Sequence, residues 1–413
     1  MSRSDLSRRG FLHSTAVGLG ALGLSAGAAG AQTGSGGTPP GPDLPVAPTG
    51  RPQPALNGPN PRPTPPGERV GWAVCGLGHF AQNYVLPHVK EGVDSRLSGL
   101  ISGTPEKLAA VGDAYGVPEA ARFDYDMAGL AEADDIDVVY VVTPNAIHEE
   151  NVVRAAEAGK HVFCEKPMAT SPAAGQRMID ACAANGVKLG IAYRAHFEPH
   201  NVEAKRMIDA GELGRIEFVS SDHHRPLDPE ATQDIWRMRK DLAGGGSLPD
   251  IGIYALNGLI WFMDEVPNRM IAQTHAPQYD DDRFAEVEAI CNVLLEFPSG
   301  RRGQISSGYI ADKKRIDIWG ADGVAVLDPA TSYMGNRLTV STTDGTEQVA
   351  VDGPDERQFW AEIDHFSRHV RDGAELRITP EMGLRDLRLI EAIYASAERG
   401  AWVEVGPDGA MTG

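Results

Sequence analysis

Two side chains that can carry a proton stand four residues apart in the middle of the chain. Asp250 and Tyr254 lie in the apolar run Asp-Ile-Gly-Ile-Tyr-Ala-Leu-Asn, which predicts a buried helix. A separation of four places both side chains on one helical face, one turn apart. A phenol with a pKa near 10 is a poor base at neutral pH unless a nearby cation lowers that pKa. The pair is a candidate acid–base site; a core tyrosine and a helix-capping aspartate are the plainer interpretation.

Lys166 is the candidate for that cation. It stands in Cys164-Glu165-Lys166-Pro167, directly after the apolar run His161-Val162-Phe163. The carboxyl ends of parallel strands border the ligand crevice of an open α/β sheet, so a lysine there can direct its ammonium into the crevice. The alternative is an ordinary surface lysine. Asp250 by itself would raise the pKa of the phenol, so we expect it to orient a substrate or to share a proton.

A glycine pattern near residue 76 predicts a dinucleotide site. The apolar run 70–75 is followed by Gly76-x-Gly78-x-x-Ala81 and then by a helical stretch toward Lys90. Gly76 would permit the tight turn, Gly78 would let the backbone approach a pyrophosphate, and Ala81 would allow close helix packing. The pyrophosphate would rest on the helix N-terminus, where free N–H groups favour an anion.

The segments that follow give this weak motif its context. A second strand (96–101), a helix (104–115) and another strand (137–142) come at the spacing of βαβ units. The sequence therefore predicts an α/β fold that begins with a Rossmann dinucleotide-binding domain over residues 70–194.

The end of the second strand selects the cofactor. NAD-binding sites place an acid there to accept from the ribose 2′-hydroxyl, whereas this chain has Ser102-Gly103-Thr104 with Lys107 just beyond. A hydroxyl and an amine suit a 2′-phosphate, so we expect NADP rather than NAD. The alternative is that Ser102 only turns the chain and Lys107 is a solvated helix charge.

Further polar motifs complete the expected site. Thr143-Pro144-Asn145-x-x-His148 follows the strand that ends at Val142, while Tyr193-Arg194-x-His196 and Trp236-Arg237 are lower-ranked candidates for ribose, nicotinamide or substrate contacts, or else ordinary packing and surface charge. The expected catalytic residues are Lys166, Asp250 and Tyr254. The expected cofactor contacts are Gly76, Gly78, His79, Phe80, Ser102, Gly103, Lys107, Tyr125, Thr143, Pro144, Asn145, His148, Glu165, Lys166, Arg194, Trp236 and Arg237.

The second half of the chain has a different pattern. Runs with two-residue alternation (215–221, 286–297, 303–307, 315–319, 324–327 and 337–340) predict a large, mainly antiparallel open sheet. Helices at 201–210, 250–262, 358–371 and 381–399 would cover one face of it. We therefore expect an α+β substrate-binding and oligomerisation domain over residues 195–413, whose open sheet face forms a homo-oligomer, a dimer or a tetramer.

We expect an export signal at the N-terminus, followed by a proline-rich segment. Ser7-Arg8-Arg9-Gly10-Phe11-Leu12 is a paired-arginine pattern, followed by a Gly/Ala-rich run too short for a membrane span and by the small-x-small triplet 29–31. Residues 1–31 are thus predicted to be a twin-arginine signal for the periplasm; a flexible tail is the alternative. Residues 32–69 hold 12 of the 29 prolines and would form either a disordered spacer or an arm over a cofactor or a neighbouring subunit.

Composition excludes several classes of partner. The chain has 413 residues and a formal net charge of −19, which argues against sequence-independent binding to nucleic acid or anionic lipid. Its four cysteines, Cys75, Cys164, Cys182 and Cys291, are far apart and indicate neither a disulfide framework nor a zinc site. No spacing supports a metal site at His223-His224, so we expect no metal. The expected partner is a small molecule.

Taken together, these motifs resemble one known family. Gly76-x-Gly78-x-x-Ala81, Thr143-Pro144-Asn145, Glu165-Lys166-Pro167 and the run from Gly244-Gly245-Gly246 to Tyr254 are similar to those of the Gfo/Idh/MocA oxidoreductases over residues 70–405. The paired-arginine signal, the proline-rich segment and Glu165-Lys166-Pro167-Met168-Ala169-Thr170 resemble a subgroup of exported sugar oxidoreductases within it. Asp222-His223-His224-Arg225-Pro226 fits no assigned pattern, so the sugar preference stays open.

The resemblance implies a reaction in two halves. Tyr254, with Lys166 lowering its pKa, would remove the proton of an aldose anomeric hydroxyl while C1 gives hydride to a tightly held NADP, yielding an aldonolactone. A second sugar, aldose or ketose, would then be reduced to an alditol in the same site. An NAD-dependent glycoside hydrolase of the same fold and a non-catalytic exported sugar-binding protein remain the alternatives.

Overall fold

The computed structural model describes residues 46–47 and 64–412. The predicted signal segment, and the proline-rich segment apart from Val46–Ala47 and residues 64–69, lie outside the described residues. In the part of the chain that is described, no helix combines the length and the apolar character needed to cross a bilayer.

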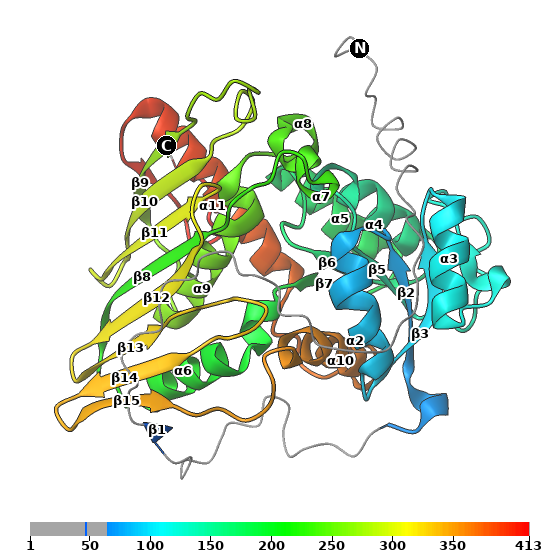
Figure 1. The fold of residues 1–413 in the computed structure, drawn as a ribbon, viewed down its shortest axis with the longest axis horizontal. Coiled ribbons are helices and arrows are strands. Elements are labelled where there is room, and N and C mark those ends of the chain that lie inside the picture. Colours follow the sequence, from blue (N-terminus) through cyan, green and yellow to red (C-terminus); the bar gives the residue numbers. More distant parts are fainter. Residues whose placement is uncertain (1–45, 48–63, 413) are drawn as a thin grey trace.

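A six-stranded parallel sheet forms the first half of the fold (Figure 1). Its strands are short and apolar on both faces because helices cover both sides, as parallel sheets require. The helices between them are α2 (Leu86–Glu91), α3 (Pro105–Tyr115), α4 (His148–Glu157) and α5 (Pro172–Ala184). The strand order is β4 (Arg122–Phe123), β3 (Ser95–Ile101), β2 (Val70–Cys75), β5 (Val138–Val141), β6 (His161–Glu165) and β7 (Leu189–Ala192).

A ten-stranded sheet forms the second half. Only the pairs β8–β11 and β1–β15 are parallel, and the other neighbours run antiparallel. The order is β1 (Val46–Ala47), β15 (Gly345–Val349), β14 (Leu338–Thr342), β13 (Gly323–Leu327), β12 (Lys313–Gly320), β8 (Ile216–His224), β11 (Arg302–Gly308), β10 (Ile290–Glu296), β9 (Arg269–His275) and β16 (Val403–Glu404). The predicted fold class, a Rossmann sheet followed by a large antiparallel sheet, is confirmed.

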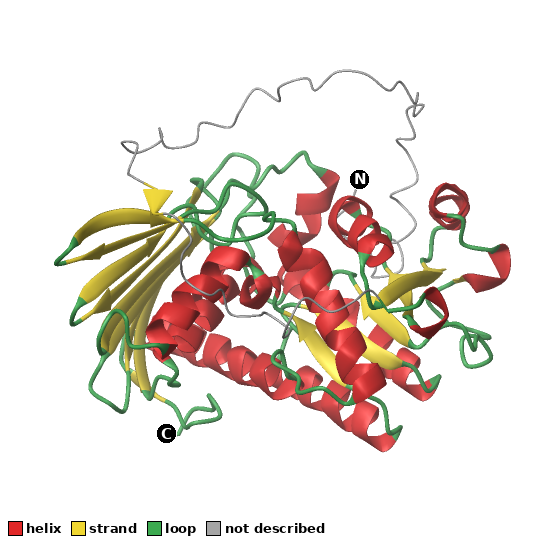
Figure 2. Cartoon of the chain, turned by 90° about the horizontal axis from the view of Figure 1, so that it is seen from below, coloured by secondary structure: helices red, strands yellow, loops and turns green. Residues whose placement is uncertain are grey.

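Helices line one face of the second sheet, and the drawn helices leave its other face open (Figure 2). They are α6 (Pro199–Asp209), α9 (Ile253–Met263) and α11 (Pro380–Arg399). Strand alternation explains the arrangement, since Val293, Leu295 and Ile305 are buried beneath the helices while Leu294 and Gln304 face outward.

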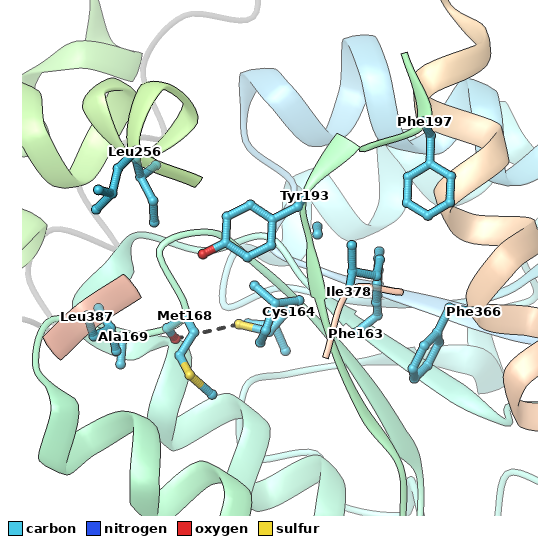
Figure 3. Packing of buried hydrophobic residues seen from close by; sticks show 14 of the residues in the cluster. Phe163, Cys164, Met168, Ala169, Tyr193, Phe197, Leu256, Phe366, Ile378 and Leu387 are labelled. Atoms are coloured by element: carbon cyan, nitrogen blue, oxygen red, sulfur yellow. Dashed lines mark hydrogen bonds between the residues drawn. The ribbon is translucent and has the colours of Figure 1, made fainter. Parts of the chain in front are cut away.

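Helix α10 (Arg357–Asp372) does not cover the second sheet, as its predicted counterpart at 358–371 was expected to, but packs against the first. Trp72 of β2 donates a hydrogen bond from Nε1 to Ser367 Oγ at 3.0 Å, and the rings of Phe163 and Phe366 stack with centroids 5.0 Å apart. Figure 3 shows Phe366 with Phe163 in this core. The apolar stripe of α10 fits either sheet, and the aromatic residues of β2 and β6 supply the surface that it covers.

One strand begins later than its sequence pattern predicts. The alternating run begins at residue 286, but strand β10 begins only at Ile290. The residues before Ile290 bind another segment of the chain instead. The buried Glu288 carboxylate accepts hydrogen bonds from the backbone N–H groups of Gly246 at 2.9 Å and Leu248 at 2.8 Å. A Cβ at Gly246 would lie 1.9 Å from the Glu288 carbonyl oxygen, so only glycine allows this approach.

Candidate active site

A cavity of about 520 Å³ lies at the carboxyl ends of β2, β3, β5 and β6 and extends to residues of the second half of the chain. Tyr333, from the segment between β13 and β14, also lines it. The position agrees with the rule that open α/β sheets bind ligands beyond the carboxyl ends of their strands. The predicted site residues that line this cavity are Gly76, Gly78, His79, Phe80, Ser102, Lys107, Tyr125, Thr143, Pro144, Asn145, His148, Glu165, Lys166, Trp236, Arg237, Asp250 and Tyr254. Gly103 and Arg194 are not among the lining residues but contact two of them, Tyr125 and Tyr254.

The end of the cavity at the Gly76 turn fits a dinucleotide pyrophosphate. Gly76 has φ +100°, and a Cβ there would lie 2.8 Å from the Val142 carbonyl oxygen, so the turn needs glycine. A Cβ on Gly78 would meet no atom within 4 Å, which leaves the backbone open to the cavity. A helical segment starts at His79, and the first residues of this segment line the same space, as at helix N-termini that bind anions.

The end of β3 presents hydroxyls and an ammonium to the cavity. Ser102, Lys107 and Tyr125 line it, and the carboxylates that line the cavity, Glu165, Asp234 and Asp250, come from other segments. Gly103 lies against Tyr125, since a Cβ there would be 2.8 Å from the tyrosine ring. Burial lowers the pKa of the Lys107 ammonium.

The residues after β5 brace the cavity wall. The Asn145 side-chain amide donates to the Ala243 carbonyl at 2.9 Å and so links the two halves of the chain. The ring nitrogens of His148 lie 2.7 Å from the Thr143 carbonyl and 3.0 Å from the Pro167 carbonyl. Either nitrogen can donate to the carbonyl that it faces, so His148 joins the loops after β5 and β6.

Lys166 lies at the inner end of the cavity. Its Nζ donates to the Asp250 backbone carbonyl at 2.6 Å and stands 4.5 Å from the centroid of the Tyr254 ring. Burial lowers the pKa of this ammonium, while the carboxylates of Asp250 and Glu165 act to raise it. The predicted meeting of Lys166, Asp250 and Tyr254 is therefore present in the fold.

The hydrogen-bond partner of the Tyr254 hydroxyl is Arg194, which was predicted as a cofactor contact. The hydroxyl accepts a hydrogen bond from Arg194 Nε at 3.1 Å, whereas Lys166 lies over the ring. Burial raises the pKa of the phenol, the Arg194 guanidinium lowers it, and Glu165 raises it. That Lys166 lowers the pKa of the phenol stays a prediction, since its Nζ lies beside the ring and is held there by the turn that precedes α9.

Asp250 is the centre of a buried charge network. It lies in a π-helical turn (Leu248–Gly252) ahead of α9. Its Oδ2 accepts from Arg237 Nε at 3.0 Å, from Tyr309 Oη at 2.9 Å and from Arg225 at 3.4 Å. Burial raises the pKa of this carboxyl, but the two guanidinium groups outweigh it and hold the pKa well below its usual range. Asp250 is therefore an ionised hydrogen-bond acceptor rather than an acid.

Several further residues of this region were missed as site residues. Among them are His223, Arg225, Asp234, Tyr309 and Tyr333. Two belong to the unassigned segment 222–226, where strand alternation directs His223 and Arg225 to the same side. The His223 ring stacks on Tyr254 with centroids 4.9 Å apart, whereas His224 bonds Ser306 on strand β11. The two histidines thus point apart.

The other lower-ranked candidates pack in the core. The Tyr193 hydroxyl donates to Asp386 at 2.7 Å, and His196 Nε2 lies 2.6 Å from Asn257 Oδ1. Neither residue lines the cavity. All four cysteines of the chain are free and buried.

Comparisons with known proteins agree with this architecture. Residues 70–193 match the oxidoreductase family model with an NAD-binding Rossmann fold, and residues 201–326 match the GFO/IDH/MocA C-terminal domain. The chain is 31% identical over 340 residues to D-xylose 1-dehydrogenase (NADP(+)) of Haloarcula marismortui, covering 81% of this chain and 93% of that protein.

Solved structures give the same result. The crystal structure of aldose-aldose oxidoreductase from Caulobacter crescentus, complexed with glycerol, has 41% identity and a TM-score of 0.78 and covers 82% of this chain and 100% of that one. Levoglucosan dehydrogenase in complex with NADH and levoglucosan shares the fold, with 22% identity and a TM-score of 0.72 over 82% of this chain and 100% of that one. The chain belongs to the Gfo/Idh/MocA oxidoreductase family.

Proposed function

We propose that the protein is a sugar oxidoreductase that keeps NADP(H) bound and passes hydride from one sugar to another. It oxidises an aldose at C1 to the aldonolactone, and it then reduces a second aldose or ketose to an alditol in a ping-pong sequence. The observation that carries this proposal is the meeting of Tyr254, Lys166 and Asp250 in one cavity with the glycine turn at Gly76. The 41% identity to an aldose-aldose oxidoreductase supports the two-sugar form.

NADP is proposed rather than NAD because of the end of β3. Ser102 and Lys107 line the cavity there, and both can donate hydrogen bonds to a ribose 2′-phosphate. A relative with 31% identity is named for its use of NADP(+). When bound, the nicotinamide ring supplies the site that accepts and returns hydride.

The chain's own residues move the proton. The Tyr254 oxygen takes the proton of the sugar hydroxyl during oxidation and returns it to the carbonyl oxygen during reduction. Asp250, ionised and fixed by two arginines, accepts hydrogen bonds from sugar hydroxyls and orients the ring. Lys166 adds positive charge beside the phenol.

Export through the twin-arginine pathway is part of the proposal. The supporting pattern, Ser7-Arg8-Arg9, lies outside the described residues. That pathway moves proteins that have already folded, so the chain could bind its nucleotide in the cytoplasm and carry it to the periplasm. A retained nucleotide would remove the need for an external supply there.

Product analysis tests the function. Purified protein is incubated with a single aldose and no added nucleotide, and the sugars are identified. We expect lactone, or the aldonate that it hydrolyses to, together with an equal amount of alditol. The change Tyr254→Phe removes the proton carrier and should abolish both products while the nucleotide stays bound. Release of an aglycone from a glycoside would instead identify a hydrolase, and unchanged sugar a binding protein.

A further inference from the structure

Arg194 is a buried cation with an unusual set of partners. It follows β7, at the start of a 3₁₀ helix (Arg194–Phe197), and only 4% of its surface is exposed. Its guanidinium donates to the Tyr254 hydroxyl at 3.1 Å, to the Thr331 carbonyl at 2.8 Å and to Gln358 Oε1. Segments from four distant parts of the chain therefore meet at this one side chain.

All three of these acceptors are neutral. In the described part of the chain, no carboxylate lies within ion-pair distance of Arg194, in contrast to Arg225 and Arg237, which share Asp234 and Asp250. A buried charge without an opposite charge is costly unless something compensates it. The one acceptor of Arg194 that can become an anion is the Tyr254 oxygen.

The direction of the hydrogen bond has a chemical consequence. Arginine has five N–H donors and no acceptor, so the Tyr254 hydroxyl accepts from it and its own proton points elsewhere. That proton remains available to a carbonyl oxygen in the cavity during reduction. During oxidation the phenolate accepts from the sugar hydroxyl, and the bond from Arg194 stays in place. One fixed arginine thus serves both protonation states of the tyrosine.

The partners of Gln358 fix this arrangement. Its amide nitrogen donates to the carbonyls of Ser332, Tyr333 and Asp355, which leaves its oxygen directed at Arg194. The side chain is fully buried. Arg194 is therefore held in position before any substrate arrives, which is the condition for electrostatic preorganisation.

We propose that Arg194 is the positioning residue of the site: it holds the Tyr254 hydroxyl in its reactive orientation and stabilises the anion that forms there when the proton leaves. The inference rests on the proposed function, since it assigns the support of that function's proton carrier. Lys166 contributes charge above the ring and donates to the Asp250 carbonyl, whereas the cation that donates to the Tyr254 oxygen is Arg194.

Other titratable groups also face Tyr254. They are Lys166 and Glu165 of the β6 end, His223 of β8, Glu362 of α10, Tyr140 of β5, Tyr193 after β7, and Tyr333. Burial raises the pKa of both Glu165 and Glu362, whereas the Arg194 guanidinium lowers both.

The test reads the acidity of the phenol without turnover. A trifluorotyrosine, which ionises at lower pH than tyrosine, replaces Tyr254 by codon suppression, and its fluorine signals are followed against pH in the purified protein. Arg194→Gln should raise the midpoint by about 1 to 3 pH units, the effect of removing one adjacent opposite charge. Arg194→Lys, which keeps the charge but loses the planar donor geometry, should give a smaller rise.

Arg377→Gln is the matched control. Arg377 is also a partly buried arginine, but it donates to the His196 carbonyl and lies over Phe197, away from Tyr254. We expect its replacement to leave the phenol midpoint unchanged. An equal midpoint shift in Arg377→Gln would overturn the proposal, because the effect would then reflect loosened packing.

Kinetics of the same variants complete the test. In the native-tyrosine protein, Arg194→Gln should lower kcat roughly 10²- to 10³-fold with little change in KM, and the rising limb of the pH profile should move to higher pH. If Arg194→Gln does not fold, Arg194→Lys carries the test. An unchanged phenol midpoint overturns the inference even if activity is lost. If Arg194→Gln shifts the midpoint but the natural protein turns over no sugar, the inference is supported and the proposed function is refuted.

Discussion

At the scale of single residues, charge at the cavity is divided between two networks. Arg225 and Arg237 are neutralised by Asp234 and Asp250, so this end is polar with little net charge. Arg194 and Lys166 both lie over the Tyr254 ring and donate hydrogen bonds to neutral oxygens. This division suits a reaction in which the substrate is uncharged and negative charge develops at one phenol oxygen.

A single change tests the choice of cofactor. Ser102→Asp places a carboxylate at the end of β3, where it would repel a 2′-phosphate and accept from a 2′-hydroxyl. We expect the nucleotide released from the purified variant to change from NADP toward NAD, with affinity for NADP at least about tenfold weaker, the value of one charged hydrogen bond. Chromatography of the acid-released nucleotide measures both.

Glu106→Gln is the control for that change. Glu106 is exposed in the first turn of α3, close in sequence to Ser102 but outside the cavity lining. Its replacement should leave the nucleotide content as in the natural protein. Unaltered NADP content in Ser102→Asp would remove this strand end from cofactor recognition.

The sequence predicted residues but not all their partners. Lys166, Asp250 and Tyr254 were predicted from strand ends and helical spacing, which are local features of the chain. The bond between Arg194 and Tyr254 joins positions 60 residues apart, and Gln358 lies 164 residues from Arg194. No local pattern specifies such contacts, because they depend on how the two sheets pack.

At the scale of elements, the bounds of the periodic segments were predicted well. The sheet that helix α10 covers was not. Strand β2 matches its predicted bounds, and β3, α3 and α11 begin or end within one residue of them. Helix α10 was assigned to the wrong sheet because an apolar stripe shows that a helix is covered but not by what. Among the strands of four or more residues, β7, β9 and β15 were not predicted.

A hydrogen-bond network between elements predicts a pH dependence. His196, 1% exposed, lies 2.6 Å from Asn257 Oδ1 through Nε2. The Asn257 amide donates to Asp386 at 2.7 Å, so its oxygen accepts from His196 and the proton of the ring is on Nε2. Burial, aided by Arg377, lowers the pKa of His196 to about 3, against the raising effect of Asn257.

The direction in which pH changes the folding stability follows from the pKa values of His196 in the unfolded and folded chain. In the unfolded chain the imidazole has a pKa near 6.5, so below that pH the unfolded chain binds a proton that the folded chain does not. The stability held by neutral His196 is complete above about pH 6.5 and is lost progressively as the pH falls toward 3. Between pH 6.5 and 5 this amounts to about 2 kcal/mol, at ~1.4 kcal/mol per pH unit.

The change His196→Gln isolates that contribution. Glutamine can donate to Asn257 but does not titrate, so the variant should lose about 2 kcal/mol less than the natural protein between pH 6.5 and 5. Urea unfolding at the two pH values measures the difference. His275, which is exposed, serves as control, and His275→Gln should keep the natural slope. Identical slopes in His196→Gln and the natural protein would refute the assignment.

At the scale of the whole molecule, one large apolar core contains buried side chains of both sheets. The open face of the second sheet carries Phe218 and the half-exposed Trp319 and Leu294. We propose that this face binds a second copy of the chain, because exposed apolar surface on a sheet favours association with another protein surface. Light scattering should give the mass of a dimer or tetramer, and Trp319→Glu should reduce it; a monomeric natural protein would exclude this role.

The central claim is that hydride leaves one sugar and reaches another within a single site, without the cofactor being released. The most direct measurement uses an aldose carrying deuterium at C1, incubated with the purified protein and no added nucleotide, followed by mass analysis of the alditol. The account predicts alditol with deuterium on its newly reduced carbon, formed in step with the lactone. Alditol without that label would contradict it. In a parallel incubation with added unlabelled NADPH, dilution of the label in the alditol would also contradict it.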